Sequence, residues 1–391
     1  MPKSAAYKPR ILLLSGYDAA SHRYWRNTLV KGLDVFDWTE IALPDRYFSW
    51  RVRGNSLSFA FQHKEALSQN YDCLIATSMV DLASLRGFVP RLANIPNLLY
   101  FHENQFDYPV KPSSNSKENA QKDVSAQLTS IYALLCADKV LFNSKYNQMT
   151  FFKGAQALLN KLPDGVPKQL LKGMEKNSQI LPVPISKKSI LPKQNLKNNK
   201  GTDSRGSFQI VWNHRWEYDK QPQVFFDAML LLKKQGIQFQ LHVLGQSFRQ
   251  VPACFEKARD SLKEEIQTWG YQSQEDYYRI LSESDIVIST ALHDFQGLSM
   301  LEAILSGCFP VAPNRVAYPE YMQDNSLYQV GDTGDEAESL FARLMEIFAL
   351  GEIPAPPIQL IKPYLDAHLL SAYQQTIMDS IKQFRQTSPA I

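Results

Sequence analysis

The sequence predicts an α/β protein built from two domains, each with a parallel sheet covered by helices. Two observations lead to this fold class. Short apolar runs alternate with segments of helical spacing, as βαβ units require, and the alternation is interrupted once by a polar segment before it restarts. The length agrees, because 391 residues exceed the roughly 100 to 200 residues of one domain. We therefore expect two Rossmann-like, doubly wound domains.

Eight apolar runs are predicted to be buried strands. Strands that are covered on both faces are almost continuously apolar, and the runs with this character are residues 10–15, 71–77, 98–101, 139–142, 208–212, 239–244, 285–290 and 308–312. Between the runs, apolar residues recur at helical spacing, for example at Trp25, Leu29 and Leu33. Another such series is Val224, Ala228 and Leu231, with Gly236 just past its end.

One polar, lysine-rich segment, residues 186–207, is predicted to be the linker between the domains. It separates an N-terminal domain, residues 1–185, from a C-terminal domain, residues 208–360. Residues 361–391 contain a helical pattern, which predicts a C-terminal helix that packs back toward the N-terminal domain. A second polar stretch, KPSSNSKENAQKD at 111–123, is predicted to be a surface loop.

Composition points to an ordinary globular enzyme. Hydrophobic residues make up 44% and charged residues 21% of the chain, and a net charge of +3 does not by itself call for nucleic acid. The four cysteines are far apart and form no CxxC pair, which indicates reduced thiols. The N-terminus lacks the apolar region of a signal peptide, and no stretch reaches the roughly 18 apolar residues of a membrane helix. We therefore expect a cytoplasmic protein with no membrane insertion.

The segment VWNHRWEYDKQP, residues 211–222, places Arg215 and Lys220 directly after a predicted strand. Ligands of open α/β sheets bind outside the carboxyl ends of the strands, so fixed cations there indicate an anionic ligand. Several familiar sites are excluded, because the chain has no GxxxxGK[ST], no GxGxxG after a strand, no GxSxG and no HExxH. The seven histidines show no metal-ligand spacing.

The most informative segment is STALHDFQGLSMLEAILSGCFPVAP, residues 289–313, which is typical of strand, loop, helix and strand. Asp294 lies in the loop, Gly297 gives the loop freedom, Glu302 lies inside the helix and Gly307 ends it. The free backbone N–H groups at the start of the helix, near Leu298 and Ser299, are of the kind that bind phosphates.

The stretch DFQGLSMLE resembles the EGFGxxxxE signature of retaining GT-B glycosyltransferases. The resemblance implies a GT-B fold with two domains facing a cleft. It further implies that Glu302 holds the ribose hydroxyls of a nucleotide sugar, that Asp294 lies near the donor sugar, and that Arg215 and Lys220 clamp the diphosphate. The donor site that it predicts also includes Gly16, Asn213, His293, Gly297, Leu298 and Ser299.

Together with WNHRWEYDKQP and HDFQGLSMLEA, the motifs YFHENQFDYPV at 100–110, FNSKYN at 142–147 and WRVRG at 50–54 are similar to the tRNA-queuosine mannosyltransferase family, over nearly the whole chain. That resemblance implies retaining, metal-independent transfer of mannose from GDP-mannose to queuosine in tRNA. His102 would position the donor sugar from below. The predicted acceptor residues are Ser21, His22, Trp50, Arg51, Arg53, Glu103 and Asn104. Among them, Trp50, Arg51 and Arg53 combine an aromatic ring with cations, which suits stacking and phosphate contact on RNA. The first loop, SGYDAASHRYW, departs from the family's glycine pair at Asp18 and Ala19, so an altered contact is expected there.

Each assignment also has a structural alternative. Asp294 could cap the helix, Glu302 could be a solvated helix residue, and Arg215 and Lys220 could belong to a solvated face. His102 and Glu103 could form a satisfied buried pair. The other such positions are Gly16, Ser21 and His22, which could be only a turn and a helix cap, and Trp50, Arg51 and Arg53, which could be an exposed basic turn.

Two further functions compete with the family reading. An enzyme of the same fold could act on a lipid or glycan acceptor, which the basic, amphipathic stretch SHRYWRNTLVKGL would suit. A non-catalytic module could bind nucleotide sugar or RNA, but it would predict a broken cation clamp, whereas Arg215, Lys220 and Glu302 are all present.

Overall fold

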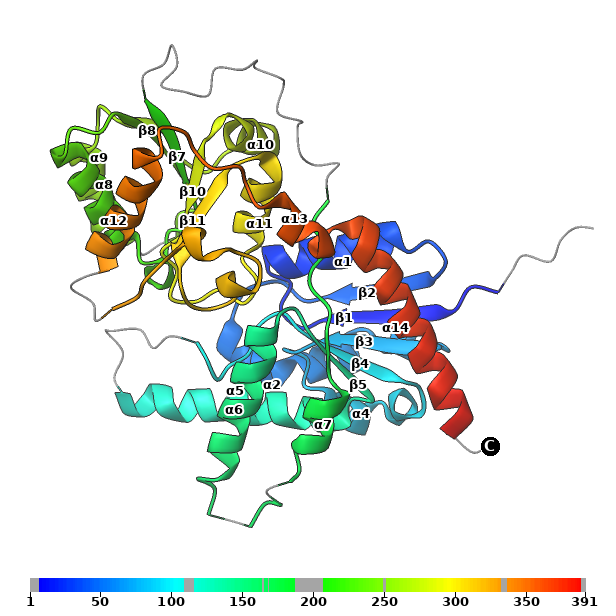
Figure 1. Ribbon diagram of the computed structural model, residues 1–391. Coiled ribbons are helices and arrows are strands. Elements are labelled where there is room, and N and C mark those ends of the chain that lie inside the picture. Colours follow the sequence, from blue (N-terminus) through cyan, green and yellow to red (C-terminus); the bar gives the residue numbers. More distant parts are fainter. Residues whose placement is uncertain are drawn as a thin grey trace, which may run out of the picture. The chain divides into compact units, whose positions relative to one another are not determined.

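The computed structural model describes residues 7–108, 116–163, 165–167, 169–186, 207–248, 251–331 and 336–387. The chain divides into two compact units (Figure 1). Unit 1 contains Met1–Pro184 and Asp366–Ile391, and unit 2 contains Ile185–Leu365. The last helix, α14 (Asp366–Thr387), therefore belongs to the unit that the first half of the chain builds. Most of the expected linker, residues 187–206, lies outside the described residues.

The sheet of unit 1 has six parallel strands in the order β2-β1-β3-β4-β5-β6. Their bounds are β1 Arg10–Ser15, β2 Asp37–Ala42, β3 Cys73–Thr77, β4 Asn97–Phe101, β5 Lys139–Phe142 and β6 Gln179–Ile180. The strand order reverses between β1 and β3. The helical elements are α1 Ala20–Gly32, α2 Phe48–Leu57, the π-helical η1 Ser58–Gln62, α3 Lys64–Leu67, α4 Leu82–Phe88, η2 Pro90–Asn94, α5 Ser116–Cys136, α6 Lys145–Leu159 and α7 Lys172–Asn177.

Helices cover both faces of this sheet (Figure 1). On one face α2, α4 and α5 contact one another, and on the other α1 contacts α14. The alternation of side chains along a strand explains why both faces are apolar. Leu12 and Leu14 of β1 join the core cluster of α4 and α5, whereas Tyr100 of β4 stacks on Trp25 of α1 with ring centroids 4.3 Å apart.

The sheet of unit 2 also has six parallel strands, in the order β12-β11-β10-β7-β8-β9. Their bounds are β7 Phe208–Asn213, β8 Phe239–Leu244, β9 Ile266–Gly270, β10 Ile286–Ile288, β11 Phe309–Pro313 and β12 Leu327–Tyr328. The helical elements are η4 Tyr218–Lys220, α8 Pro222–Lys234, α9 Cys254–Ser261, α10 Gln274–Glu283, α11 Leu298–Ser306, η5 Tyr318–Glu320, η6 Asp324–Ser326, α12 Glu336–Ala349, α13 Ile358–Ile361 and η7 Lys362–Tyr364. Here the order reverses between β7 and β10, the position at which doubly wound sheets bind ligands.

All eight predicted strands are present, and their bounds differ from the prediction by at most two residues. The strands that the sequence did not predict are β2, β6, β9 and β12. The prediction of a surface loop at 111–123 is wrong from residue 116 onward, because α5 begins at Ser116. Lys, Glu, Ala and Gln in this stretch are good helix formers, so its polarity was mistaken for a lack of helix. Residues 109–115 lie outside the described part.

Candidate active site

The loop after β7 and the loop after β10 are joined by Lys220. Its Nζ donates a hydrogen bond to the carbonyl oxygen of His293 at 2.5 Å. The same nitrogen lies 3.7 Å from Oδ2 of Asp294 and 3.6 Å from Oδ2 of Asp219. The Lys220 side chain is only 9% exposed. Three oxygens surround this buried nitrogen, so the Lys220 side chain is fixed at the carboxyl ends of β7 and β10.

Arg215 is the more accessible of the two predicted cations. Its side chain is 47% exposed, with Nη1 2.6 Å from Oε2 of Glu217 and Nη2 3.8 Å from Oδ2 of Asp219. β7 and β10 are neighbours in the sheet, which brings Arg215, two residues past the end of β7, to the same edge as Asp294. Arg215, Lys220 and Asp294 therefore lie together at the point where the strand order reverses, the position at which such sheets bind ligands.

Asp294 is held by the start of α11. Its Oδ1 accepts a hydrogen bond from the backbone N–H of Gly297 at 2.7 Å, and its Oδ2 accepts one from the hydroxyl of Tyr318 at 3.1 Å. Burial alone would raise the pKa of this carboxyl, but Lys220 and the Gly297 N–H outweigh burial and hold the pKa below its ordinary value. Asp294 is therefore an anion at neutral pH.

Glu302 projects from α11 toward α10. The hydroxyl of Tyr277 donates to Oε2 at 3.0 Å, and the hydroxyl of Tyr278 donates to Oε1 at 3.2 Å. Asn213, at the end of β7, donates from Nδ2 to the Tyr277 hydroxyl at 3.1 Å and to the Ser299 carbonyl at 3.0 Å. Burial raises the pKa of the Glu302 carboxyl, and the two phenol donors oppose that rise. The two tyrosines were not predicted, because nothing in their spacing along the chain marks them as partners of Glu302.

The start of α11 has the geometry that the sequence predicted. Gly297 has φ of 75°, in the left-handed region, and a Cβ there would lie 2.4 Å from the Tyr321 hydroxyl oxygen. Only glycine fits both conditions. Leu298 is the first helical residue, with Ser299 next, and Gly307 with φ of 101° follows the last. The first N–H groups of a nine-residue helix have no partner within it, and they carry partial positive charge.

Two histidines of unit 2 flank this edge as neutral rings. Burial, followed by the nearby Lys220, lowers the pKa of His214 to about 3 and that of His293 to about 4. Both imidazoles are therefore uncharged at neutral pH, and the positive charge of the cluster comes from Lys220 and Arg215.

In unit 1, His22 of α1 and His102 after β4 stack on each other. Their ring centroids are 4.0 Å apart with planes inclined by 19°, and Trp25 meets His102 edge-on at 4.8 Å. Burial lowers the pKa of His22 to about 4 and the pKa of His102 well below its ordinary value. Gly16, directly after β1, donates its N–H to Oγ1 of Thr77 at 3.2 Å. These residues occupy the carboxyl edge of the first sheet.

The remaining predicted residues of unit 1 differ in accessibility. Ser21 is exposed. Asn104 is buried, and its Nδ2 donates to Oδ1 of Asn147 at 2.8 Å and to Oγ1 of Thr150 at 2.9 Å. Its Oδ1 accepts the N–H of Phe106. Asn104 thus fixes the loop after β4. The half-buried Glu103 accepts from Ser78 through its carbonyl oxygen.

Asp18, one of the two positions that depart from the family's glycine pair, is buried, and its carboxylate lies 3.3 Å from Nε of Arg23 and 3.1 Å from Nη2 of Arg26. The departure therefore serves the packing of α1.

Trp50, Arg51 and Arg53 lie on α2, so the alternative of a basic turn is wrong. Trp50 is 55% exposed. Arg53 is exposed and donates from Nη1 to Oγ1 of Thr129 at 3.2 Å, whereas Arg51 is half-buried. The predicted residues thus form separate groups, one around Lys220 and Glu302 in unit 2 and the others on unit 1.

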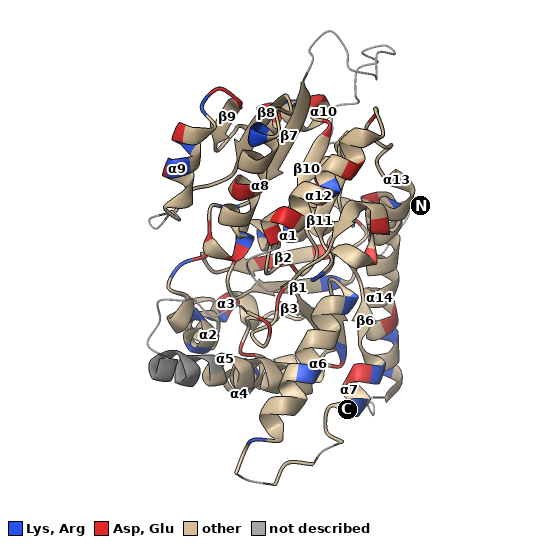
Figure 2. Cartoon of the chain, turned by 60° about the vertical axis from the view of Figure 1, so that its left-hand side comes forward, with Lys and Arg blue, Asp and Glu red and all other residues tan. Residues whose placement is uncertain are grey.

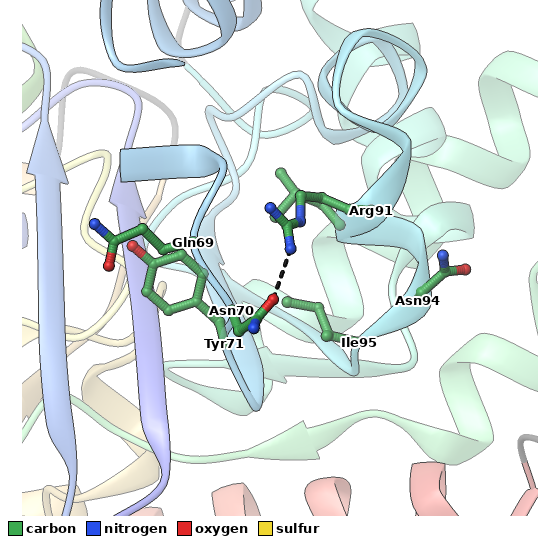
Figure 3. Close-up of a pocket in the computed structure, with 7 residues that line it drawn as sticks. Gln69, Asn70, Tyr71, Arg91, Asn94 and Ile95 are labelled. Carbon is green, nitrogen blue, oxygen red and sulfur yellow. Dashed lines mark hydrogen bonds between the residues drawn. The ribbon is translucent and has the colours of Figure 1, made fainter. Parts of the chain in front are cut away.

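A small pocket elsewhere in unit 1 does not belong to this site. Its volume is about 250 Å³, and Figure 3 shows Arg91 reaching Oδ1 of Asn70 across it at 2.7 Å. Asn70 precedes β3 and Arg91 precedes β4, so the pocket lies at the amino ends of the strands. Gly16 and His102 lie at the opposite edge.

The described residues lack two further features. No helix among them combines the length and apolarity needed to cross a membrane. In the same part of the chain, no three His, Cys, Asp or Glu side chains are grouped so that they could hold a metal ion.

Comparison with known proteins matches both halves of the chain to families. Residues 10–185 match the model of the tRNA-queuosine alpha-mannosyltransferase N-terminal region, and residues 193–355 match glycosyl transferases group 1. The tRNA-queuosine alpha-mannosyltransferase of Drosophila melanogaster is 33% identical over 343 residues, which cover 87% of this chain and 89% of that protein.

Solved structures match the fold over nearly the whole chain. Anabaena HepE in complex with UDP and glucose is similar with a TM-score of 0.62 and 13% identity, over 95% of this chain and all of that one. Sucrose-phosphate synthase from Thermosynechococcus elongatus is similar with a TM-score of 0.63 and 16% identity, over 97% of this chain and 99% of that one. These likenesses concern the fold alone, and the prediction of a GT-B fold with two Rossmann-like domains is confirmed.

Proposed function

Because the chain belongs to the tRNA-queuosine alpha-mannosyltransferase family, we propose that it transfers mannose from GDP-mannose to queuosine in tRNA. The identity of 33% over 87% of the chain establishes the family and confirms the resemblance of the sequence motifs. The acceptor and the sugar follow from the relative's activity, and the donor nucleotide from the family resemblance. We place the reaction in the cytoplasm, where tRNA is available.

The observation that carries the proposal is the cation cluster at the switch point of unit 2. Breaking a glycosyl–phosphate bond leaves negative charge on the departing diphosphate. Lys220, held between His293 O and Asp294, together with Arg215 and the N–H groups at the start of α11, provides fixed positive charge for it. Groups that are already oriented need no rearrangement as the charge develops, which makes such stabilisation a large term in catalysis.

Glu302 is suited to hold the ribose of the donor. Each of its oxygens receives one tyrosine hydroxyl, and a carboxylate oxygen can accept a second hydrogen bond. Two ribose hydroxyls can therefore donate to Glu302 while Tyr277 and Tyr278 keep its orientation. Burying a carboxylate without hydrogen-bond donors costs free energy. The two tyrosine hydroxyls therefore stabilise Glu302 in the folded protein, and the ribose hydroxyls would add two further donors on binding.

The neutral state of His102 supports a positioning role for it. Its low pKa means that its ring carries no charge at neutral pH and offers one N–H and one acceptor nitrogen. We propose that it orients the donor sugar, that the configuration at the sugar is retained, and that a donor phosphate oxygen takes the proton of the acceptor hydroxyl. Arg215 and Lys220 stabilise the leaving diphosphate in this scheme, without a metal ion.

The structure removes the observation that favoured a lipid acceptor. The amphipathic stretch SHRYWRNTLVKGL is α1, and its apolar residues Trp25 and Leu29 are buried in unit 1. The apolar side of the helix therefore packs on its own sheet. The alternative of a non-catalytic binding module loses its support as well, because Lys220, Arg215 and Asp294 come together at one edge.

The test is transfer of labelled sugar to purified tRNA. GDP-mannose and UDP-glucose are offered in parallel, each to tRNA that contains queuosine and to the same tRNA without it, with and without a chelator. We expect label only from GDP-mannose on queuosine-containing tRNA, with the same rate in chelator. Label from UDP-glucose would refute the donor, label on both tRNAs would refute the acceptor, and loss of transfer in chelator would refute the metal-free scheme.

A further inference from the structure

We propose that α2 and the π-helical turn after it form a stacking surface for unpaired nucleotides of the acceptor RNA, an inference that rests on the proposed tRNA substrate. We call this region the α2 surface and define it by three aromatic and three basic side chains: Tyr47, Trp50, Phe61, Arg46, Arg53 and Lys64. All six lie in unit 1, so the inference needs no placement of one unit against the other.

The α2 surface carries several cations, and its own stretch of sequence supplies no acid. Between Asp45 and Glu65 the sequence contains Arg46, Arg51, Arg53 and Lys64 but no Asp or Glu, and α2 carries blue segments and no red ones in Figure 2. In the part of the chain that the structure describes, the ion pairs engage other arginines and lysines and none of these four. Clustered cations without acidic residues among them are suited to bind a polyanion. The phosphate groups of a nucleic acid backbone form such a polyanion.

Exposed aromatic rings are interleaved with these cations. Tyr47 is 72% exposed, Trp50 55% and Phe61 66%. Large aromatic side chains usually bury most of their surface, so three exposed rings within fifteen residues indicate a binding face. Unpaired bases stack on such rings, and cations beside the rings contact the backbone phosphates. A paired helix cannot offer its base faces in this way, so the surface is suited to a single-stranded loop.

The orientation of Trp50 is set by a glycine. A Cβ on Gly54 would lie 2.4 Å from Cε2 of the Trp50 indole, so the ring lies directly against the backbone of α2. Gly54 is buried while Trp50 is half exposed. Glycine weakens a helix interior relative to alanine. Its presence here lets the indole pack against the helix backbone while Trp50 stays 55% exposed, which suits a stacking platform.

The α2 surface lies at the catalytic edge of unit 1. The Phe48 ring meets Tyr17, the residue after Gly16, edge-on at 5.7 Å. Asn55 of α2 donates to the carbonyl oxygen of Met79 at 2.8 Å in the loop after β3. These contacts anchor α2 to the loops that follow β1 and β3, on the side of the sheet where His102 lies. α2 is thereby fixed to the edge of unit 1 that carries Gly16 and His102.

Binding of RNA without any donor tests this directly. The full-length protein is titrated into a fluorescein-labelled RNA hairpin with an unpaired loop, and into a fully paired duplex of equal length. We expect Trp50→Ala and Gly54→Ala each to weaken hairpin binding roughly tenfold and to leave duplex binding unchanged. Gly54→Ala keeps every side chain of the surface and displaces only the indole, and alanine favours the helix. Tyr271→Ala removes an aromatic ring of 78% exposure in unit 2 and serves as the matched control.

The charge contribution has a separate readout. Replacing Arg53 with Gln is expected to weaken hairpin and duplex binding alike and to lower the slope of log affinity against log salt by about 1. Hairpin binding by Trp50→Ala and Gly54→Ala at wild-type strength would overturn the proposal. So would Trp50-dependent binding to vesicles of anionic phospholipid in place of the hairpin.

The two proposals fail in different ways. If the wild type transfers mannose to queuosine-containing tRNA while Trp50→Ala keeps the wild-type KM for that tRNA, the α2 surface is refuted and the enzyme activity stands. If the wild type transfers nothing but binds the hairpin through Trp50, the activity is refuted and the surface is supported.

Discussion

At the scale of single residues, Lys220 and Arg215 carry the same charge in different surroundings. Lys220 is nearly buried, and its ammonium neutralises Asp219 and Asp294. Its removal would leave buried carboxylates without a partner and would destabilise the fold. Arg215 is about half exposed, and exposed ion pairs contribute little to stability. A substitution of Arg215 can therefore test the catalytic role of a cation without a large loss of stability.

We predict that Arg215→Ala lowers kcat for mannose transfer by about 100-fold to 1000-fold, by analogy with the loss of one oxyanion donor. The melting temperature should stay close to that of the wild type, because the side chain is exposed and its pairs with Glu217 and Asp219 are weak. Arg279→Ala is the matched control, since Arg279 has a 50% exposed side chain and also pairs with two acids. Steady-state kinetics and thermal unfolding of both variants test this prediction. Equal kcat values for Arg215→Ala and Arg279→Ala would contradict the catalytic role of Arg215.

The tyrosine partners of Glu302 yield a second prediction. The Tyr277 hydroxyl lowers the pKa of a carboxyl that burial raises, so Tyr277→Phe should raise that pKa further, because a hydrogen bond to the charged form is lost. Because ribose binding needs the carboxylate, the acid limb of GDP affinity against pH should move to higher pH. Calorimetric titration with GDP measures it.

The control for this prediction is Tyr271→Phe, which alters an exposed tyrosine of the same unit. If Tyr277→Phe binds GDP more weakly by the same factor at every pH, Tyr277 has only a packing role.

The sequence predicted some of these residues and missed others for a physical reason. Arg215, Lys220, Asp294 and Glu302 stand in two short segments, each of which follows a strand, so one strand–loop pattern brings each segment to the sheet edge. Tyr277 reaches Glu302 only because α10 packs beside α11. Such a partnership between helices leaves no periodicity in the chain.

At the scale of elements, all the strands that the sequence did not predict are sheet edges. β2 and β6 bound the first sheet, and β9 and β12 bound the second. An interior strand is covered on both faces and flanked on both sides, so it is a continuous apolar run. In the edge strand β2, DWTEIA, Ile41 is buried and the other residues are exposed or half-buried, and β6 and β12 have two residues each. Apolar runs thus identify the centre of a parallel sheet and leave its edges unmarked.

The helix α14 gives a prediction at this scale. Tyr373 accepts a hydrogen bond from Nε1 of Trp25 at 2.9 Å and contacts the carbonyl oxygens of Leu181 and Pro182 at 3.1 and 3.0 Å. Tyr373→Phe leaves the buried Trp25 N–H without its acceptor, so unit 1 should lose about 1 to 3 kcal/mol of stability. Chemical denaturation followed by Trp fluorescence measures the loss.

GDP affinity supplies the comparison for this variant, because its proposed ligands lie in unit 2 and should be unaffected. Unchanged stability of Tyr373→Phe would mean that α14 is held by its apolar contacts alone, through residues such as Leu369 and Ile377.

At the scale of the whole molecule, both units repeat one plan, a six-stranded parallel sheet with its chemistry at the carboxyl edge. The restart of strands after residue 207 was sufficient to predict this plan. α14 is grouped with unit 1, the domain toward which the helix of residues 361–391 is predicted to pack. Each unit also buries a pair of neutral imidazoles at that edge: His22 with His102, and His214 with His293.

These buried imidazoles predict the pH dependence of stability. In the unfolded chain they take up protons below the ordinary value of 6.5, whereas in the folded protein the pKa is about 4 for His22 and His293, about 3 for His214, and well below 6.5 for His102. The unfolded state thus binds more protons, and stability falls as pH drops through this window, by about 1 kcal/mol per histidine per pH unit. Glu302 and Asp107 oppose the trend because burial raises the pKa of each carboxyl, which favours the protonated folded form. They are two groups against five, because burial also lowers the pKa of His242 to about 4.

Denaturant unfolding between about pH 7.5 and pH 5 checks this prediction. The free energy of unfolding should decrease steadily on acidification, and His102→Asn should reduce the steepness of that decrease for unit 1, because one proton fewer is taken up on unfolding. His368→Asn, at an exposed position of α14, should reproduce the wild-type curve. Stability that stays constant or increases toward pH 5 would show that the four rings titrate in the folded protein. That result would also contradict the proposed positioning of the donor sugar by His102, which requires a neutral ring.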